Sequence, residues 1–269
     1  MTETPTDDSD ELAASDDHGA PGDQPETRAT TERPSVLVPL EVLEGASLPN
    51  GTPALLANAH VVLLGYHVIP EQTAAEQARE QFGETGMAKL DEFADALAAA
   101  GADVETRLVF THDEATTIDR LIYEHDCLAV LVPNGVAQVE SVLFPLRGTV
   151  GIERNSRLVA GLFADADVDV TLYHALDADE SPEDGASFVA GVAATLTERG
   201  IAEDRIDTVV EDATVPIDAI ADRAASYDAV VMGETDPSVT TFVFGMPSEQ
   251  IAERFLGPVL VVQRERPEE

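Results

Sequence analysis

Short apolar runs alternate with stretches of helical pattern from about residue 35 to residue 263, and this alternation limits the fold more than any other feature. The runs are rich in valine and leucine, which is typical of strands buried on both faces of a parallel sheet. Polar and apolar residues mix at helical spacing between many of them. The predicted strands cover residues 35–42, 60–69, 104–110, 128–133, 141–146, 168–176, 206–210, 229–233 and 258–263.

Helices are predicted between many of these strands, and glycines at the helix C-cap position support several of them. Strands separated by helices imply right-handed βαβ units. We therefore expect an α/β fold, with parallel twisted sheets and flanking helices. The predicted helices cover residues 73–100 (broken near Gly83 and Gly86), 114–125, 154–163, 186–199, 217–226 and 248–256.

A weak internal repeat indicates that the chain holds two related units. Residues 59–68 are similar to residues 167–175, so that His67 and His174 end comparable strands. Either histidine could point into a ligand crevice at the carboxyl edge of the sheet, or could serve the structure alone.

The repeat divides the chain into three parts. Residues 1–33 are acidic and poor in large aliphatic residues, which predicts a disordered N-terminal segment. Two pseudo-repeats follow, at residues 34–139 and 140–266. The strand at 128–133 runs almost directly into the strand at 141–146, so we expect the first repeat to lack its terminal helix and strand.

The charge of the chain is extreme, with 52 acidic residues against 15 basic ones and a net charge of −37. Most of this negative charge lies beyond residue 33. An ordinary protein with an acidic N-terminal tail would therefore not account for the net charge. Molar salt shortens the Debye length to about 3 Å and screens such self-repulsion. The composition therefore favours a protein adapted to a high-salt cytoplasm. It also argues against nucleic-acid binding, because no basic stripe is present.

Other sequence signals are mainly negative. The N-terminus shows no signal-peptide pattern and no apolar run approaches 18 residues, which predicts a cytoplasmic protein that is not inserted in a membrane. Cys127 is the single cysteine and lies in an apolar run, which favours a buried thiol. The histidines show no metal-binding spacing, and no catalytic motif is present, so we predict neither a metal site nor a catalytic residue.

The order of elements in the second repeat resembles the universal stress protein family. Residues 169–174 resemble the second strand of that family, and residues 228–233 resemble its fourth strand, which begins with aspartate and ends with glycine. The most specific match is residues 248–254 followed by 257–262, which resembles the last helix and last strand. The first repeat resembles the family more loosely.

Nucleotide-binding members of this family share a loop after the fourth strand, with the pattern Gly-x-x-Gly, nine residues, then Gly-Ser or Gly-Thr. Backbone N–H groups in such a loop can hold phosphates. Here Asp236 replaces the second glycine, and Glu234 adds another negative charge. At an effective dielectric constant of 20, two like unit charges about 4 Å apart repel by about 4 kcal/mol. These carboxylates would therefore oppose the binding of a triphosphate. The residues that correspond to the loop are Gly233, Glu234, Thr235, Asp236, Gly245 and Ser248.

The same binders have an aspartate after the first strand that contacts the nucleoside. Glu41 stands at that place in the first repeat and could supply the acid, whereas Arg147 stands there in the second repeat and could not. Both ends of the nucleotide site are thus altered, so the resemblance favours a protein that does not bind ATP in the usual way.

The resemblance implies a non-enzymatic stress-response or regulatory protein that acts through dimerisation and protein partners, such as a transporter or another regulator. Family members commonly pair their last strands, which predicts a homodimer through Val259, Leu260, Val261 and Val262. The alternative is a nucleotide sensor or slow ATPase that uses ATP at the altered loop. A third reading is a small-molecule enzyme that uses the crevice near His67 and His174.

Overall fold

The structure is a computed structural model, which describes residues 32–43, 45, 47–135, 138–149, 151–176, 179–213, 216–233 and 257–263. The predicted N-terminal segment, apart from its last two residues, lies outside this part of the chain. The predicted helix at 248–256 also lies outside it.

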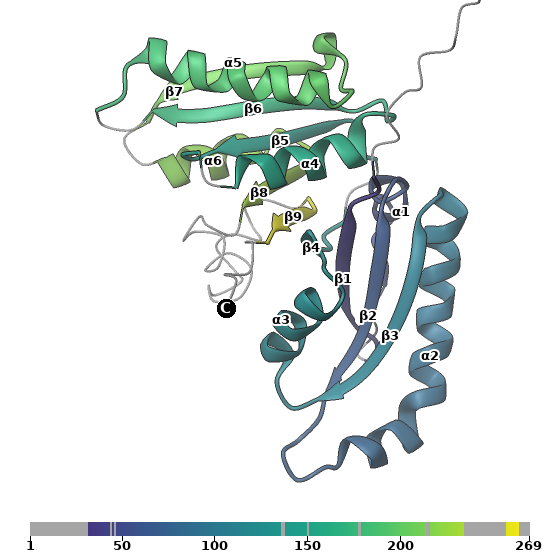
Figure 1. Cartoon of the computed structure of the whole chain (residues 1–269). Helices are drawn as coiled ribbons and strands as arrows, with labels where there is room; N and C mark the ends of the chain where they lie inside the picture. Colours follow the sequence, from purple (N-terminus) through teal and green to yellow (C-terminus); the bar gives the residue numbers. More distant parts are fainter. Residues whose placement is uncertain are drawn as a thin grey trace, which may run out of the picture. The chain divides into compact units, whose positions relative to one another are not determined.

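Strands and helices alternate along both halves of the described chain (Figure 1). The first half contains β1 (Ser35–Glu41), α1 (Thr52–Leu55), β2 (His60–Val68), α2 (Ala75–Ala100), β3 (Asp103–Thr111), α3 (Glu114–Glu124) and β4 (Ala129–Val132). The second half contains β5 (Ser141–Leu146), α4 (Ile152–Phe163), β6 (Asp169–Leu176), α5 (Pro182–Glu198), a 3-10 turn η1 (Glu203–Arg205), β7 (Ile206–Asp212), α6 (Pro216–Ala224), β8 (Ala229–Gly233) and β9 (Val259–Val262).

The described strands form one sheet in the order β3-β2-β1-β4-β9-β8-β5-β6-β7. Neighbouring strands are parallel, except for the antiparallel pair β4 and β9. The order β3-β2-β1-β4 in the first half is matched by β7-β6-β5-β8 in the second. This confirms the predicted α/β fold class, with a mostly parallel sheet and flanking helices. One sheet crosses both predicted repeats, so their limits at 34–139 and 140–266 stay a prediction.

Strand β9 is paired along both of its edges within the chain. Val130 of β4 lies opposite Val261 on one side, and Met232 of β8 lies opposite Val261 on the other. The predicted homodimer needs a free edge on this strand, and the intrachain pairing leaves none. A dimer would therefore have to use a different surface.

In its described residues, the first half has no strand that corresponds to β9. The described residues between β4 and β5, at 133–135 and 138–140, contain neither a helix nor a strand. β9 takes the place beside β4 that a further strand of the first half would fill.

Several helix ends follow from local sequence. Ser181 caps α5 by accepting a hydrogen bond from the N–H of Asp184 at 3.1 Å, and Pro182 suits the first turn, so α5 begins earlier than the predicted residue 186. Asp113 caps α3 by accepting from the N–H of Thr116 at 3.0 Å. Gly101 ends α2 with a φ of 115°, which a residue with a side chain rarely adopts.

The predicted break in the long helix near Gly83 and Gly86 is wrong, because α2 runs continuously through both residues. A Cβ atom at Gly86 would lie 3.1 Å from a methyl group of Leu108 in β3. The glycine therefore allows close helix–sheet packing (Figure 1).

Helices cover both faces of the sheet. Residues of α2, α4 and α5 pack in one apolar cluster with Val36, Val38 and Phe144. The strand residues that point the opposite way pack in two other clusters, with α3 in the first half and α6 in the second. This two-sided burial explains why the strands are apolar along nearly their whole length.

Cys127 lies in the cluster beside α3, as expected from its apolar run, and only 3% of it is exposed. Burial raises the pKa of its thiol to about 11. No described helix is both long enough and apolar enough to span a membrane.

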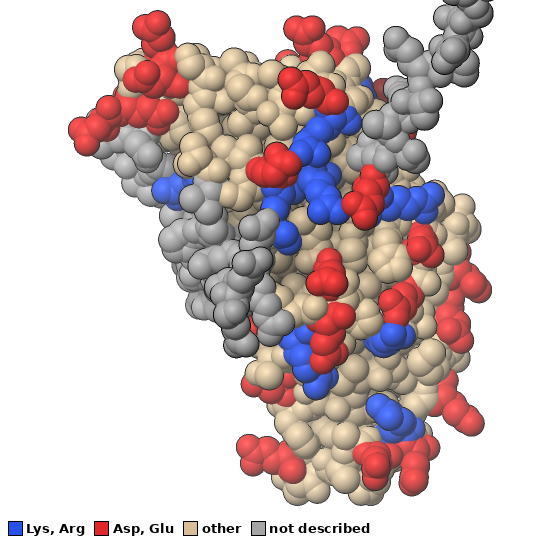
Figure 2. All heavy atoms as spheres, viewed as in Figure 1, with Lys and Arg blue, Asp and Glu red and all other residues tan. Residues whose placement is uncertain are grey.

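Acidic side chains are spread over the face shown in Figure 2, whereas many basic side chains gather near its centre. Arginines on and around α4 are engaged within the chain. Arg205 donates to the carbonyl oxygens of Phe163 and Ala164, which satisfies the C-terminal end of that helix. Arg154 donates to the carbonyl oxygen of Gln263, just after β9, at 2.9 Å.

Candidate functional site

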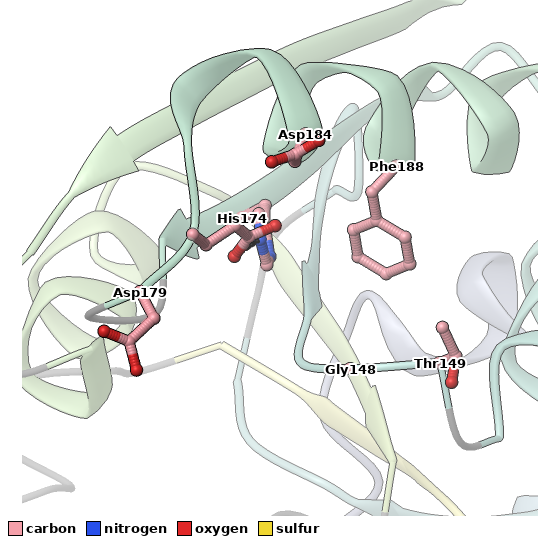
Figure 3. Close-up of a pocket in the computed structure, with 7 residues that line it drawn as sticks. Gly148, Thr149, His174, Asp179, Asp184 and Phe188 are labelled. Carbon is pink, nitrogen blue, oxygen red and sulfur yellow. Dashed lines mark hydrogen bonds and ion pairs between the residues drawn. The ribbon is translucent and has the colours of Figure 1, made fainter.

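A pocket of about 540 Å³ lies at the carboxyl ends of β5 and β6, next to the first turns of α5 (Figure 3). Ligands of open α/β sheets bind at this edge, because the loops that follow the strands meet there. The residues that line the pocket are Gly148, Thr149, His174, Asp179, Glu180, Asp184 and Phe188.

His174 forms the inner wall of the pocket and is only 3% exposed. Its Nδ1 lies 3.0 Å from the carbonyl oxygen of Leu146, and its Nε2 lies 2.8 Å from Oε2 of Glu180. A carbonyl oxygen only accepts hydrogen bonds, so Nδ1 carries a proton. The contact with Glu180 then needs a second proton, either on Nε2 or on the carboxyl group. Both ring nitrogens of His174 are therefore engaged, one by a backbone carbonyl and one by a carboxyl group.

The first turns of α5 supply a second wall. Asp184 and Phe188 lie one helical turn apart, on the same side of α5 (Figure 3). The hydroxyl of Ser181 donates to Oδ2 of Asp184 at 2.6 Å and fixes that carboxylate at the start of the helix. The Phe188 ring lies edge-on to the His174 ring, with 5.0 Å between their centroids.

Gly185 brings this wall close to the sheet. A Cβ atom there would overlap a methyl group of Leu176 and would lie 3.3 Å from Cδ2 of His174. A larger residue at this position would require the side chain of Leu176 to move and would crowd the His174 ring, so this glycine allows α5 to lie close to β6.

Carboxylates dominate the charge of the pocket. Asp179, Glu180 and Asp184 line it, and the described lining residues include neither lysine nor arginine. Sequence reasoning singled out His174 and missed these acids and Phe188, because acidic residues are abundant everywhere in the chain. The signal that was available is the pair Ser181 and Asp184, which is an N-cap pattern a few residues after the strand that ends at Leu176.

The same position is built differently in the first half. Leu40 of β1 lies opposite Gly65 of β2, just as Leu146 of β5 lies opposite His174 of β6. The counterpart of His174 is therefore Gly65, and the suggested equivalence of His67 and His174 is wrong by two residues. Methyl groups of Leu90 would lie within 3.0 Å of a Cβ atom at Gly65, so α2 closes over this position.

His67 lies further along β2 and pairs with Glu41. Its Nδ1 is 2.7 Å from Oε1 of the glutamate, and its ring is edge-on to the rings of Phe82 and Phe110. An apolar cluster that contains Phe110 and Ile69 fills the neighbouring space. Glu41 was predicted as a nucleoside ligand, and the contact with His67 engages its carboxyl group. Its role in ligand binding stays a prediction.

The predicted phosphate loop falls mostly outside the described residues. Gly233 ends β8 and lies opposite Val262 of β9. The other predicted members, which are Glu234, Thr235, Asp236, Gly245 and Ser248, lie beyond it, so the loop stays a prediction. Arg147, after β5, is exposed. Within the described ranges, no group of three histidine, cysteine or acidic side chains is placed to hold a metal ion.

Comparisons with known proteins give a structural likeness alone. No family model and no curated protein matches the sequence. The crystal structure of a universal stress protein from Archaeoglobus fulgidus DSM 4304 matches with a TM-score of 0.57 at 15% identity, covering 86% of this chain and 98% of that one.

Two further solved structures show weaker likeness. A functionally unknown protein from Pseudomonas aeruginosa PAO1 has a TM-score of 0.49 at 16% identity, covering 88% of this chain and 95% of that one. A universal stress protein from Archaeoglobus fulgidus in complex with dAMP has a TM-score of 0.36 at 18% identity, covering 47% of this chain and 99% of that one. The first of the three likenesses assigns the universal stress protein fold to this chain.

Proposed function

We propose that this chain is a non-enzymatic regulatory protein of the universal stress protein type, and that it binds one small molecule in the pocket around His174. The observation that carries the proposal is the pocket itself, which lies at the carboxyl edge of parallel strands β5 and β6. In open α/β sheets this edge is where ligands bind.

One ligand per chain is expected, because described side chains cover the corresponding strand positions of the first half. Leu90 covers Gly65, and the rings of Phe82 and Phe110 pack around His67. The two halves thus share an order of strands but differ in what covers the strand ends. The second half supplies the ligand site, and the first half supplies structural support through β4.

Binding without turnover agrees with the chemistry of the lining residues. Both ring nitrogens of His174 are engaged, one by a backbone carbonyl and one by Glu180, so the ring is poorly placed to take a proton from a ligand. Thr149 is the one hydroxyl-bearing residue among the described lining residues. A nucleophile would need a neighbouring base to activate it.

Protein partners and a homodimer also belong to the proposal, with the correction that β9 is not the interface. The outer strands β3 and β7 are poor substitutes, since acidic residues such as Asp103 and Glu211 stand on them. Charged residues on edge strands oppose pairing between chains. A regulatory partner such as a transporter would therefore contact a surface other than a strand edge. Cytoplasmic location and adaptation to high salt belong to the same proposal.

The test is a binding measurement on the full chain in molar KCl, using isothermal titration with adenosine, AMP, ATP with Mg²⁺, and simple amines. We expect at least one of these to bind with a stoichiometry of one and to be recovered unchanged by mass spectrometry. Thr149→Trp should abolish this binding, because the indole would fill the pocket. Thr197→Trp, on an exposed position of α5, is the matched control and should bind as the unaltered chain does.

Three results would overturn the proposal: no binding by any compound, chemical conversion of the bound compound, or equal binding by the Thr149→Trp variant. The same titration tests the alternative function, in which the chain is a nucleotide sensor. Tight ATP binding that survives Thr149→Trp would favour a site at the predicted loop after Gly233.

A further inference from the structure

We infer that the ligand of this pocket carries an ammonium group, and that the pocket selects organic cations over neutral and anionic molecules of the same shape. This inference rests on the proposed function, because it names the chemical class of the molecule that the pocket around His174 takes.

The charge of the pocket is the first reason. Glu180 is engaged by His174, and the carboxyl groups of Asp179 and Asp184 also line the pocket, whose described lining residues include neither lysine nor arginine. A ligand with a phosphate or carboxylate group would meet like charges there. A ligand ammonium group would supply the missing positive charge and would donate hydrogen bonds to those carboxylates.

Phe188 is the second reason. It lies one turn of α5 beyond Asp184 and projects toward Thr149 and Gly148 across the pocket (Figure 3). The face of an aromatic ring attracts a cation, and its surface also accepts the alkyl chain attached to that cation. A carboxylate and a phenyl ring on one side of a helix together match both ends of an alkylammonium ion.

The fixed geometry of the wall is the third reason. Ser181 holds Oδ2 of Asp184, Leu146 and Glu180 hold His174, and Gly185 keeps α5 close to the sheet. The groups that would contact the ligand are therefore in place before it arrives, which reduces the entropy lost on binding.

The test uses three probes of one shape that differ in charge: hexylammonium, hexan-1-ol and hexanoate. Their affinities for the full chain are measured by isothermal titration in molar KCl. We expect hexylammonium to bind at least tenfold more tightly than hexan-1-ol, and hexanoate to bind least. Asp184→Asn should weaken hexylammonium binding about tenfold and leave hexan-1-ol binding within about twofold.

Glu183→Gln is the matched control, because it removes one charge from the same helical turn at an exposed residue that does not line the pocket. It should change hexylammonium affinity by less than about twofold. Phe188→Leu should weaken hexylammonium more than hexan-1-ol, since leucine keeps the apolar surface but loses the ring face.

Equal affinity for hexylammonium and hexan-1-ol would overturn the inference, and so would an equal loss in Glu183→Gln and Asp184→Asn. If AMP or hexanoate binds in the pocket and hexylammonium does not, the inference fails while the proposed function stands. If no probe or nucleotide binds at all, both fail together.

Discussion

Leu131 in β4 lies opposite Leu260 in β9, and both side chains are fully buried. This antiparallel pairing joins the first half of the sheet to the second. It also places β9, which follows β8 along the chain, at the centre of the strand order, between β4 and β8. The last described strand is therefore part of the common core of both halves.

Leu260→Ala should destabilise the whole sheet. Removing a large buried aliphatic side chain typically costs about 2–5 kcal/mol, and Leu260 belongs to the cluster that α2, α4 and α5 share. Urea unfolding in molar KCl, followed by circular dichroism, measures the change. Val68→Ala, at a position that is 44% exposed, should alter the free energy of unfolding by no more than about 0.5 kcal/mol. A similar loss in both variants would contradict the central role of β9.

Two glycines of α5 should respond in opposite directions to alanine. Nothing lies within 4 Å of a Cβ atom at Gly191, so Gly191→Ala should stabilise the protein by about 0.5–1 kcal/mol through helix propensity. At Gly185 the added methyl group would overlap Leu176, and overpacking of about 1–3 kcal/mol should outweigh that gain. Thermal unfolding of the two variants gives the comparison. A higher free energy of unfolding in Gly185→Ala would show that the packing between α5 and β6 has room for the added methyl group.

The fold was largely predictable, whereas the site was only partly so. Continuous apolar runs such as 60–69 and 141–146 identify buried parallel strands, because burial on both faces leaves no room for polar alternation. The position of β9 beside β4 depends on contacts between distant residues, and no local pattern encodes it. Likewise, the register that makes Gly65 the counterpart of His174 is fixed by strand pairing, so sequence similarity matched His174 to His67 instead.

Cys127 should be almost inert in the folded protein. With its pKa raised to about 11 by burial, the thiol is protonated at pH 8, and it is also shielded from solvent. Modification by 5,5′-dithiobis(2-nitrobenzoic acid) at pH 8 should be slow in buffer and fast in denaturant. Rapid labelling of the native protein would contradict this burial.

The same thiol should make the protein less stable in alkali. The unfolded chain ionises near the ordinary value of 9.0, whereas the folded chain ionises near 11, so stability falls as the pH rises between these values. Two pKa units correspond to about 2–3 kcal/mol. Cys127→Ala should lose less stability than the unaltered chain between pH 9 and 11, as measured by urea unfolding. If both proteins lost the same free energy of unfolding between pH 9 and 11, ionisation of Cys127 would not contribute to the loss.

Asp113, which caps α3, should make the stability of the protein depend on pH in the acid range. The hydrogen bond from the N–H of Thr116 lowers the pKa of this carboxyl below its ordinary value of 3.8. A lowered folded pKa stabilises the protein above that value, and the contribution is lost as the pH falls through the folded pKa. Asp113→Asn should be less stable than the unaltered chain at pH 6, with the difference shrinking below about pH 4. Hydrogen exchange of α3 amides measures it, and a difference independent of pH would contradict the linkage.

The central place of β9 also sets an order of events during synthesis. Strands β1 to β8 leave the ribosome first, and until β9 emerges both β4 and β8 lack their neighbour. The pairing that completes the sheet joins segments far apart in sequence, which is the kind of contact that forms slowly. A nascent chain would therefore expose two strand edges that the finished sheet closes, and unpaired edges of this kind can pair with other chains during that interval.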